Sequence, residues 1–377
     1  MISLYFHIPF CTQKCPYCDF YSLPVEDQLL GGYPDQLRRE LELRSGEAGG
    51  EIVESVYFGG GTPSLLPPTA VAMLLNTVRE DYRLAADAEI TLEVNPGTVD
   101  IGTLADLYSA GVNRLSIGAQ SFDDLQLRTL GRSHDVARIG ATIAAARRVG
   151  FDALSLDLIY ALPGQSPEDL RQELAALLAF NVDHLSCYAL TVEPGTPFAA
   201  RQQAGELESA DDESARDAFV TVHEMLCAAG YIHYEISNFA RPGHACRHNQ
   251  RYWQRTESYF GFGAGAHSFD ARGWGRRLAN PDDLAGYLTT MRAGGDPRVN
   301  VEVFDRAGAL AERLYLGLRT RSGVTDVELR ERFGVALATT FPRALTKCGA
   351  RLQKNNGVWS FDLDGWLLFN HLISEFL

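Results

Sequence analysis

The chain has 377 residues, of which 46% are hydrophobic, and its net charge is −14 at neutral pH. That length suits one large domain and one smaller domain around a sizeable apolar core. The acidic balance argues against nucleic acid as a partner, because two short basic clusters (residues 147–148 and 272–277) do not reverse it. We find no targeting signal and no apolar run of membrane-spanning length, so we expect a cytoplasmic protein, with only peripheral membrane contact left open.

Six apolar runs alternate with helix-like segments in residues 1–230. Helices are expected to begin near Pro34, Pro67, Thr98, Asp135, Ser166 and Asp211, from proline positions and capping residues. Repeated βα units build a parallel sheet, and six units are too few for the usual closed barrel of eight. We therefore predict an α/β fold with an incomplete (β/α)6 barrel over residues 1–230. The predicted strands are residues 2–8, 55–58, 90–94, 114–118, 153–160 and 184–190.

The pattern changes after residue 230. Residues 231–270 are rich in aromatic residues, histidine and glycine and have no helical period, and helical patterns return at 281–292 and 306–318. We predict a loop-rich connecting segment over 231–300. Residues 301–377 indicate a small C-terminal α+β domain of winged-helix-like pattern, with a hairpin turn at residues 355–357.

Three of the seven cysteines, Cys11, Cys15 and Cys18, follow the first predicted strand with the spacing C-x3-C-x2-C. Thiolates are ligands of zinc, copper(I) and iron–sulfur clusters. Structural zinc usually takes four ligands, often from paired knuckles, and disulfides would leave one cysteine over. These two alternatives are therefore less favoured than a three-cysteine iron–sulfur cluster, in which one iron would stay open to a small molecule.

A glycine turn, residues 59–63, follows the second predicted strand and has neither P-loop nor Rossmann spacing. Glycines at a strand end let backbone amides approach an anion such as a carboxylate, although a simple tight turn would need them too. Glu93, Gln120, Asp157 and Ala189 lie at the ends of later strands. Because carboxyl ends of parallel strands meet at one edge of a barrel, we expect a site there.

Together these motifs resemble the radical S-adenosylmethionine (SAM) superfamily, in the branch of oxygen-independent coproporphyrinogen III oxidase. The matching sequence motifs are residues 5–18, 59–63, 93–96, 118–122, 131–132 and 157–164, in order along the predicted barrel. The resemblance implies that Cys11, Cys15 and Cys18 bind a 4Fe–4S cluster whose open iron takes the amino and carboxylate groups of SAM. It also implies radical chemistry from SAM, and an electron donor such as flavodoxin or ferredoxin. The residues implied to contact SAM are Tyr5, Tyr17, Gly60, Gly61, Thr62, Glu93, Gln120, Arg132, Asp157 and Ala189.

Two features depart from the oxidase pattern. The oxidase carries a further cysteine two places after the third, where this chain has Phe20, and it has an extension before the first strand that is absent here. Both departures argue against porphyrinogen decarboxylation. The motif His248-Asn249-x-x-Tyr252-Trp253 instead resembles the signature motif of the HemW heme-chaperone subfamily. This resemblance implies heme binding and transfer of heme to an acceptor protein. The oxidase reaction is the runner-up, and a structural metal module is a third reading.

The residue types of this motif suit heme binding. Imidazole is a common axial ligand of heme iron, so His248 is the expected ligand, with Cys246 as an alternative. Tyr252 and Trp253 can pack on a porphyrin face, and Asn249 can orient the imidazole or bond a propionate. The competing interpretation is a hydrogen-bonded clamp at His248 and Asn249, with Trp253 in the core. Histidines held in reserve as ligands are His233, His244 and His267.

Overall fold

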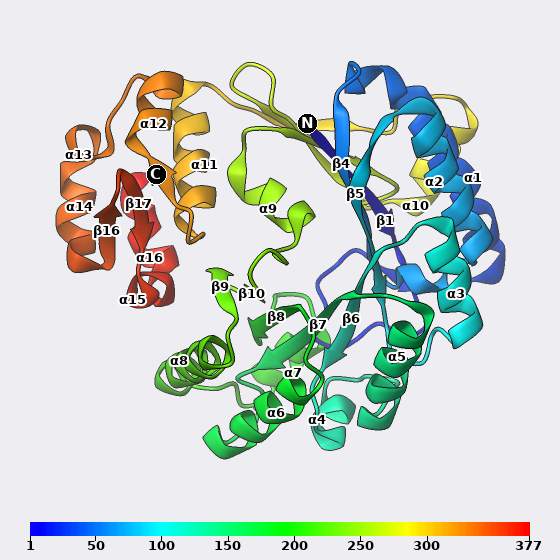
Figure 1. The fold of residues 1–377 in the computed structure, drawn as a ribbon, viewed down its shortest axis with the longest axis horizontal. Coiled ribbons are helices and arrows are strands. Elements are labelled where there is room, and N and C mark those ends of the chain that lie inside the picture. The colour runs from blue at the N-terminus through cyan, green and yellow to red at the C-terminus, as the bar shows by residue number, and fades with distance from the viewer.

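One curved β-sheet forms the centre of the protein (Figure 1). The computed structural model describes all 377 residues apart from the side chains of residues 27–29. Within this description the sheet has twelve strands, in the order β14-β13-β12-β11-β1-β4-β5-β6-β7-β8-β10-β9. The strands from β11 to β8 run parallel, and antiparallel strands extend the sheet at both edges.

The six strands predicted for residues 1–230 are confirmed, as is the incomplete barrel that they build. They are β1 (Ile2–Ile8), β4 (Ile52–Gly60), β5 (Arg83–Val94), β6 (Arg114–Gln120), β7 (Ala153–Tyr160) and β8 (His184–Ala189). A short parallel pair, β2 (Phe10–Cys11) and β3 (Leu23–Pro24), encloses the cysteine loop.

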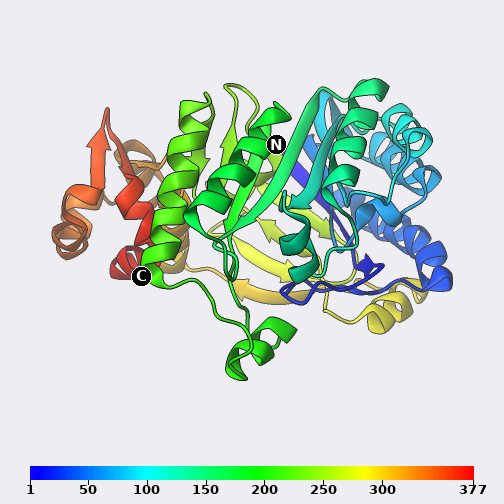
Figure 2. The same cartoon turned by 90° about the horizontal axis from the view of Figure 1, so that it is seen from below.

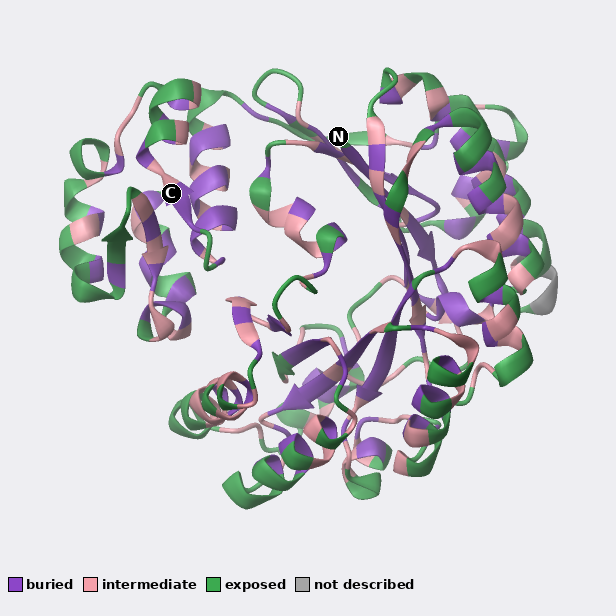
Figure 3. Ribbon diagram, in the orientation of Figure 1, coloured by how far each residue is buried: buried purple, intermediate pink, exposed green. Residues whose placement is uncertain are grey.

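Helices cover the outer face of the curved sheet, whose buried strands Figure 3 shows in purple. Capping residues set several of their starts as predicted: Asp135 and Asp211 accept backbone N–H groups, and Ser166 forms a capping box with Asp169. The helices are α1 (Asp27–Arg44), α2 (Pro68–Asp81), α3 (Ile101–Ala110), α4 (Asp124–Thr129), α5 (Val136–Val149), α6 (Pro167–Ala179), α7 (Pro197–Gln203) and α8 (Asp212–Ala228), with 3-10 turns at η1 (Ser45–Ala48) and η2 (Pro63–Leu65).

Two predicted helix starts are wrong. Helix α3 begins after Asp100, whose carboxylate accepts the N–H of Thr103, rather than at Thr98. Helix α1 begins before Pro34, which lies inside it. A proline inside a helix removes one backbone hydrogen bond. Burial of Tyr33, Leu37 and Leu41 against the sheet offsets that loss, so packing overrides the local signal.

The prediction of a loop-rich segment over 231–300 is also wrong. This part of the chain supplies strands to both sheet edges, and its longest-range pairing puts β11 beside β1. The error arises because these strands are short and because the β11–β1 pairing joins segments that lie far apart in the sequence. The elements are β9 (Ile232–Glu235), β10 (Asn238–Ala240), α9 (Arg247–Gln254), β11 (Ser258–Phe262), β12 (His267–Asp270), β13 (Arg276–Ala279), α10 (Leu284–Arg292) and β14 (Val299–Val303).

The C-terminal part forms the predicted small α+β unit, which Figure 2 shows at the opposite end of the molecule from α1 and α2. In its hairpin, Asn356 and Gly357 both have positive φ, 52° and 85°, as a two-residue turn of type I′ requires. Its elements are α11 (Arg306–Leu318), β15 (Val324–Thr325), α12 (Asp326–Phe333), α13 (Leu337–Thr340), α14 (Pro342–Cys348), η3 (Gly349–Arg351), β16 (Leu352–Asn355), β17 (Val358–Phe361), α15 (Leu363–Leu367), α16 (Phe369–Ile373) and η4 (Ser374–Phe376).

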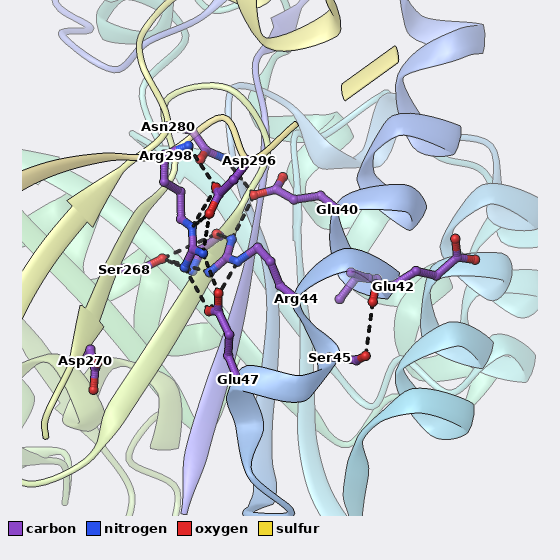
Figure 4. Close-up of polar contacts among 12 residues, drawn as sticks. Glu40, Glu42, Arg44, Ser45, Glu47, Ser268, Asp270, Asn280, Asp296 and Arg298 are labelled. Carbon is purple, nitrogen blue, oxygen red and sulfur yellow. Dashed lines mark hydrogen bonds and ion pairs between the residues drawn. The ribbon is translucent and has the colours of Figure 1, made fainter. Parts of the chain in front are cut away.

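A buried polar network fixes the β11 edge to helix α1 (Figure 4). Arg44 pairs with Glu40 at 2.8 Å and donates to the carbonyl of Gly261 at 2.6 Å. Glu40 also accepts from the N–H of Gly263 at 2.8 Å and from the hydroxyl of Tyr287 at 2.9 Å. Because both charges are fully buried, these partners replace the water that they lose on folding.

The inner face of the sheet is polar, unlike the aliphatic interior of a closed barrel. Alternation along each strand sends Phe6 and Leu92 outward to the helices and Tyr5 and Glu93 inward. Helix α9 lies on this inner side, in contact with β4, β11 and α11 (Figure 1). No helix in the described residues is long and apolar enough to cross a bilayer.

Candidate functional site

A cavity of about 630 Å³ opens where the parallel strands end. The cysteine loop forms one side of it. Two backbone hydrogen bonds hold the base of that loop: Leu23 N–H donates to the carbonyl of Pro9 at 2.7 Å, and Val25 N–H donates to the carbonyl of Cys11 at 2.9 Å. All three cysteines of the loop line the cavity. The sheet therefore presents three thiols to one enclosed space.

The thiols have hydrogen-bond donors from other parts of the barrel. Thr62 donates its hydroxyl to Cys11 Sγ, and Arg132 donates from Nη1 to Cys15 Sγ, both at 3.5 Å. Donors of this kind are suited to sulfur atoms that ligate a metal group, because partners outside the ligand set orient the ligands. Arg132 is itself held by the carbonyl of Gly118, at 3.1 Å, and by the side chain of Asn95.

The rival interpretations of the cysteines find no support in this geometry. All seven cysteines are free, so the disulfide alternative is wrong. Within the described side chains, no three His, Cys, Asp or Glu residues converge on the position of a single metal ion. The three loop thiols instead line one large cavity, as a cluster with one thiolate on each of several irons requires.

The glycine turn is built for close approach. A Cβ on Gly61 would lie 2.7 Å from the Phe10 carbonyl oxygen and 3.0 Å from Cys11 Sγ. Gly60 has φ +112°, and a Cβ there would lie 2.7 Å from the His7 ring. A side chain at Gly61 would press on the cysteine loop and one at Gly60 on the His7 ring, so these glycines do more than make a turn.

Two half-buried acids, Glu93 and Asp157, lie close together on the inner wall. Burial, then the charge of Asp157, raises the pKa of Glu93 to about 7, although Tyr57 donates its hydroxyl to Glu93 at 2.9 Å. Burial also raises the pKa of Asp157 to about 6, against a hydrogen bond from Ser116 at 3.3 Å. Both groups can hold a proton near neutral pH, so the wall carries less negative charge than its composition suggests.

The structure brings together nearly all of the predicted SAM residues. Tyr5 is the exception: it lies in an adjoining inner chamber of about 280 Å³, with its hydroxyl 3.0 Å from His7 Nδ1. The two spaces share wall residues, among them Phe20, Glu93 and Asp157. The predicted SAM residues that line the main cavity are Tyr17, Gly60, Gly61, Thr62, Glu93, Gln120, Arg132, Asp157 and Ala189.

The four predicted heme residues are not brought to one place. His248, Asn249 and Tyr252 line the inner chamber. Trp253 lies on the other side of α9, against the C-terminal unit, where the Arg319 guanidinium stacks 4.1 Å from the centre of its ring. The helix thus turns one face to the barrel and the other to the C-terminal helices.

His248 is buried, with both ring nitrogens engaged. Nδ1 lies 3.0 Å from the Ser55 hydroxyl, which itself donates to Ser3, so Nδ1–H is the donor of that pair. The lone pair of Nε2 is then left to accept from the Tyr252 hydroxyl at 2.8 Å. Burial lowers the pKa of His248 to about 3, so the imidazole is neutral. The clamp interpretation paired His248 with Asn249, whereas the hydrogen-bond partners of this ring are Ser55 and Tyr252.

The other predicted heme ligands are placed less favourably. Burial raises the pKa of Cys246 to about 12, and its Sγ lies 3.4 Å from Glu89, so it is a thiol rather than a thiolate ligand. His233 is packed between Phe239 and Trp366 in the core. His244 and His267 are exposed and line neither chamber.

Arg114 and Tyr188 line the inner chamber and were not among the predicted site residues. One signal could have found Arg114: a charged residue opens an apolar strand that is buried along its length. Tyr188 carried no such signal, because tyrosine is ordinary in a strand.

Comparison with known proteins places this site. Residues 5–177 match the sequence model of the Radical SAM superfamily, and residues 304–368 match that of the HemN C-terminal domain. The structure is similar to that of coproporphyrinogen III oxidase (HemN) from Escherichia coli, with a TM-score of 0.85 and 26% identity, over 100% of this chain and 89% of that one.

Curated relatives are more similar in sequence. Heme chaperone HemW of Escherichia coli (strain K12) is 44% identical over 267 residues, 71% of this chain and 69% of that protein. Heme chaperone HemW of Bacillus subtilis (strain 168) is 33% identical over 380 residues, 100% of this chain and 99% of that protein.

An open parallel barrel with three thiols at the end of its first strand and a glycine turn after its second defines a protein of the radical SAM class. Within that superfamily, the chain belongs to the HemW family. Membership of the superfamily implies a 4Fe–4S cluster and SAM as cofactors.

The residues of the main cavity fit both groups. Three thiols, two of them with hydrogen-bond donors, suit a cluster, and the glycine turn lines the same cavity beside them, where a ligand of the cluster would lie. A cavity of 630 Å³ lies within the range that holds a ligand of this size.

Proposed function

We propose that the protein is a heme-binding protein of radical SAM type that acts as a heme chaperone and transfers heme to an acceptor protein. The observation that carries this proposal is the end-to-end match to a relative named heme chaperone HemW, which covers the whole of this chain. Phe20 supports it from the site. That side chain is exposed at the wall shared by the two chambers, where the oxidase pattern has a further cysteine.

In this proposal Cys11, Cys15 and Cys18 hold the 4Fe–4S cluster. When bound, the cluster and SAM supply one-electron chemistry. The chain's own residues position SAM and exclude water: Tyr17, the glycine turn with Thr62, and the polar wall of Glu93, Gln120, Arg132, Asp157 and Ala189. Tyr5 would contribute indirectly from the inner chamber, where it stacks on Tyr57, the residue that donates to Glu93.

His248 is the proposed ligand of heme iron. Its neutral imidazole is the form that binds a metal, and its Nε2 lone pair has one competitor, the Tyr252 hydroxyl. Iron binding therefore requires that this hydrogen bond is given up. Asn249 and Tyr252 flank the imidazole, and Trp253 contributes indirectly by seating α9 on the C-terminal unit.

The remaining parts of the proposal concern partners and place. A reduced flavodoxin or ferredoxin is the proposed electron donor, and the acceptor is a hemoprotein that lacks its heme. A reducing compartment such as the cytoplasm would keep the cluster thiols reduced. Contact with a membrane would be peripheral.

Heme titration after anaerobic reconstitution tests the function. The wild-type protein is expected to bind heme with a shifted Soret band, and to pass it to an apo-hemoprotein whose own spectrum then appears. A wild-type protein that binds no heme would overturn the proposal. His248→Ala is expected to lose the imidazole-ligated spectrum, and Tyr252→Phe, which frees Nε2, to keep it.

The exposed His244 provides the matched control for these variants, since His244→Ala should leave the spectrum unchanged. Circular dichroism melting checks that His248→Ala still folds. If the heme spectrum of a folded His248→Ala is that of the wild type, His248 is not the ligand, whereas the carrier function stands.

A second candidate function is oxidation of coproporphyrinogen III, which the similarity to the oxidase structure favours. The same reconstituted protein, given SAM, a reductant and coproporphyrinogen III, distinguishes the two. Formation of the divinyl product would establish the oxidase reaction. No product together with heme transfer would leave the chaperone function.

A further inference from the structure

The inner chamber contains a buried cation with no counter-ion in contact. Arg114 lies at the start of β6, is 5% exposed and lines the chamber wall. Within the described residues its one hydrogen bond runs from Nη1 to Thr91 Oγ1 at 3.5 Å, and it forms no ion pair within 4.0 Å. A buried guanidinium with so few partners is costly unless a ligand supplies the missing contact.

Comparison with the other buried arginines shows how unusual this is. Arg44, Arg251, Arg255 and Arg313 are each more than nine-tenths buried, and each contacts a glutamate side chain: Glu40, Glu54, Glu312 and Glu328 respectively. Arg114 is the only arginine of this buried group, within the described residues, that lacks such a partner.

The acids nearest to Arg114 are engaged elsewhere. Glu89 accepts the N–H of Arg247 and the N–H of His248, both at 3.1 Å, at the start of α9. Glu93 accepts from Tyr57, and Asp157 accepts from Ser116. Burial alone would lower the pKa of Arg114, but the nearby Glu89 carboxylate raises it. The cation is thus stabilised at a distance and left without a direct partner.

We infer that Arg114 binds a carboxylate of the ligand that occupies the inner chamber, and that this carboxylate is a propionate group of heme. The choice of heme rests on the proposed function. A guanidinium recognises a carboxylate through two parallel hydrogen bonds, which suits this planar, buried donor.

Size and wall chemistry favour an acidic arm at the inner end of the chamber, with the ring extending out of it. A chamber of 280 Å³ is smaller than the ~300–1,000 Å³ that usually holds a drug-sized ligand, so a tetrapyrrole whose iron reaches His248 must extend beyond the chamber toward the main cavity. At the wall shared with the main cavity stand Phe20 and Tyr188, which are 68% and 42% exposed. Flat aromatic side chains at that opening suit the face of a porphyrin whose propionate reaches inward.

The test compares heme with heme dimethyl ester, whose propionates carry no charge. Wild-type protein is expected to bind heme about tenfold or more tighter than the ester, since a hydrogen bond to a charged group contributes roughly 1.5–3 kcal/mol. Arg114→Gln is expected to lose that preference by weakening heme alone. Arg114→Lys, which keeps the charge, is expected to restore part of it.

SAM carries a carboxylate too, so the affinity for SAM is measured in the same proteins. Unchanged SAM affinity in Arg114→Gln supports the propionate assignment. If Arg114→Gln instead loses affinity for SAM and keeps its affinity for heme, the carboxylate that Arg114 binds is that of SAM. This result would overturn the propionate assignment.

Equal preference for heme over the ester in wild type and in Arg114→Gln would also overturn it, while the carrier function stood. Failure of wild type to bind heme at all would overturn both. If Arg114→Gln does not fold, the affinities of the wild-type protein for heme and for the dimethyl ester still test the inference. Equal affinities for the two ligands would overturn it.

Discussion

The Glu89 carboxylate accepts the backbone N–H of His248, with Oε1 3.1 Å from that nitrogen. Its other oxygen accepts the N–H of Arg247, also at 3.1 Å. The first N–H groups of a helix have no partner within the helix, and the helix dipole favours negative charge there. A strand of the barrel wall therefore anchors the helix that carries the proposed heme ligand.

Replacing Glu89 should loosen this anchor. Glu89→Gln keeps the shape but removes the charge and one acceptor, so we expect it to lower the free energy of unfolding by about 1–2 kcal/mol and to weaken heme binding. Urea denaturation and heme titration measure the two effects. Asp87 provides the control: it pairs with Arg247 on the surface, and Asp87→Asn should cost about 0.5 kcal/mol or less. Equal losses in both variants would contradict the anchoring role.

The glycine turn makes a sharper prediction about the cofactors. A Cβ on Gly61 would press on the Phe10 carbonyl and on Cys11 Sγ. Overpacking of this kind costs roughly 1–3 kcal/mol, so Gly61→Ala should bind SAM about tenfold more weakly and hold less iron after reconstitution. Iron and sulfide analysis and equilibrium dialysis measure this.

Gly32 is the matched glycine for this test. It lies in α1, and a Cβ added there would meet no atom of the described residues within 4 Å. Gly32→Ala should therefore bind SAM normally and stabilise the helix by about 0.5–1 kcal/mol. SAM affinity of the wild-type value in Gly61→Ala would show that the close approach of the turn is not needed.

Local patterns explain which parts of this fold could be predicted. The barrel strands, the capped helices and the Asn356–Gly357 turn have signals within a few residues, and the structure confirms them. The β11–β1 pairing joins segments about 250 residues apart, for which no local pattern exists. Helix α9 shows no single apolar face, because one side enters the polar barrel and the other meets the C-terminal unit.

The residues of the site also differ in whether a local sequence pattern predicts them. Cys11, Cys15 and Cys18 could be found because their spacing alone indicates a metal group, and the structure places them on one cavity. The hydrogen-bond partners of the His248 ring are Ser55 on β4 and Tyr252, one helical turn along α9. The first of these contacts depends on how α9 docks, which the sequence does not encode locally.

The buried pair of Glu40 and Arg44 should be among the most sensitive structural positions. Glu40→Ala leaves the fully buried Arg44 guanidinium with only the longer carboxylate contact to Glu47, at 3.6 Å, and loss of the main partner of a buried ion pair typically costs about 3–5 kcal/mol. We expect an unfolding midpoint far below that of wild type. On the exposed side of the same helix Glu42 pairs with Arg38, and Glu42→Ala should cost about 0.5 kcal/mol or less. Similar losses in the two variants would mean that the network in Figure 4 does not fasten β11.

Glu173 on α6 gives the protein a pH-dependent stability term. Burial raises its pKa from 4.5 to about 7, against a hydrogen bond from Ser121 at 2.9 Å, and its second oxygen lacks a partner in the described structure. Because the folded pKa lies above the unfolded one, the stabilisation by the protonated form is complete below pH 4.5. It is lost as the pH rises through about 7.

Glu173→Gln mimics the protonated form and should remove this loss. At pH 8.5 the variant is expected to exceed the wild type in free energy of unfolding by about 2–3 kcal/mol, and at pH 4 the two should be nearly equal. Urea denaturation across this range measures the difference. The exposed Glu331 on α12 is the control, since Glu331→Gln should follow the wild type within about 0.5 kcal/mol at every pH. A Glu173→Gln curve parallel to that of wild type would show that Glu173 ionises in the folded protein as freely as it does in the unfolded chain.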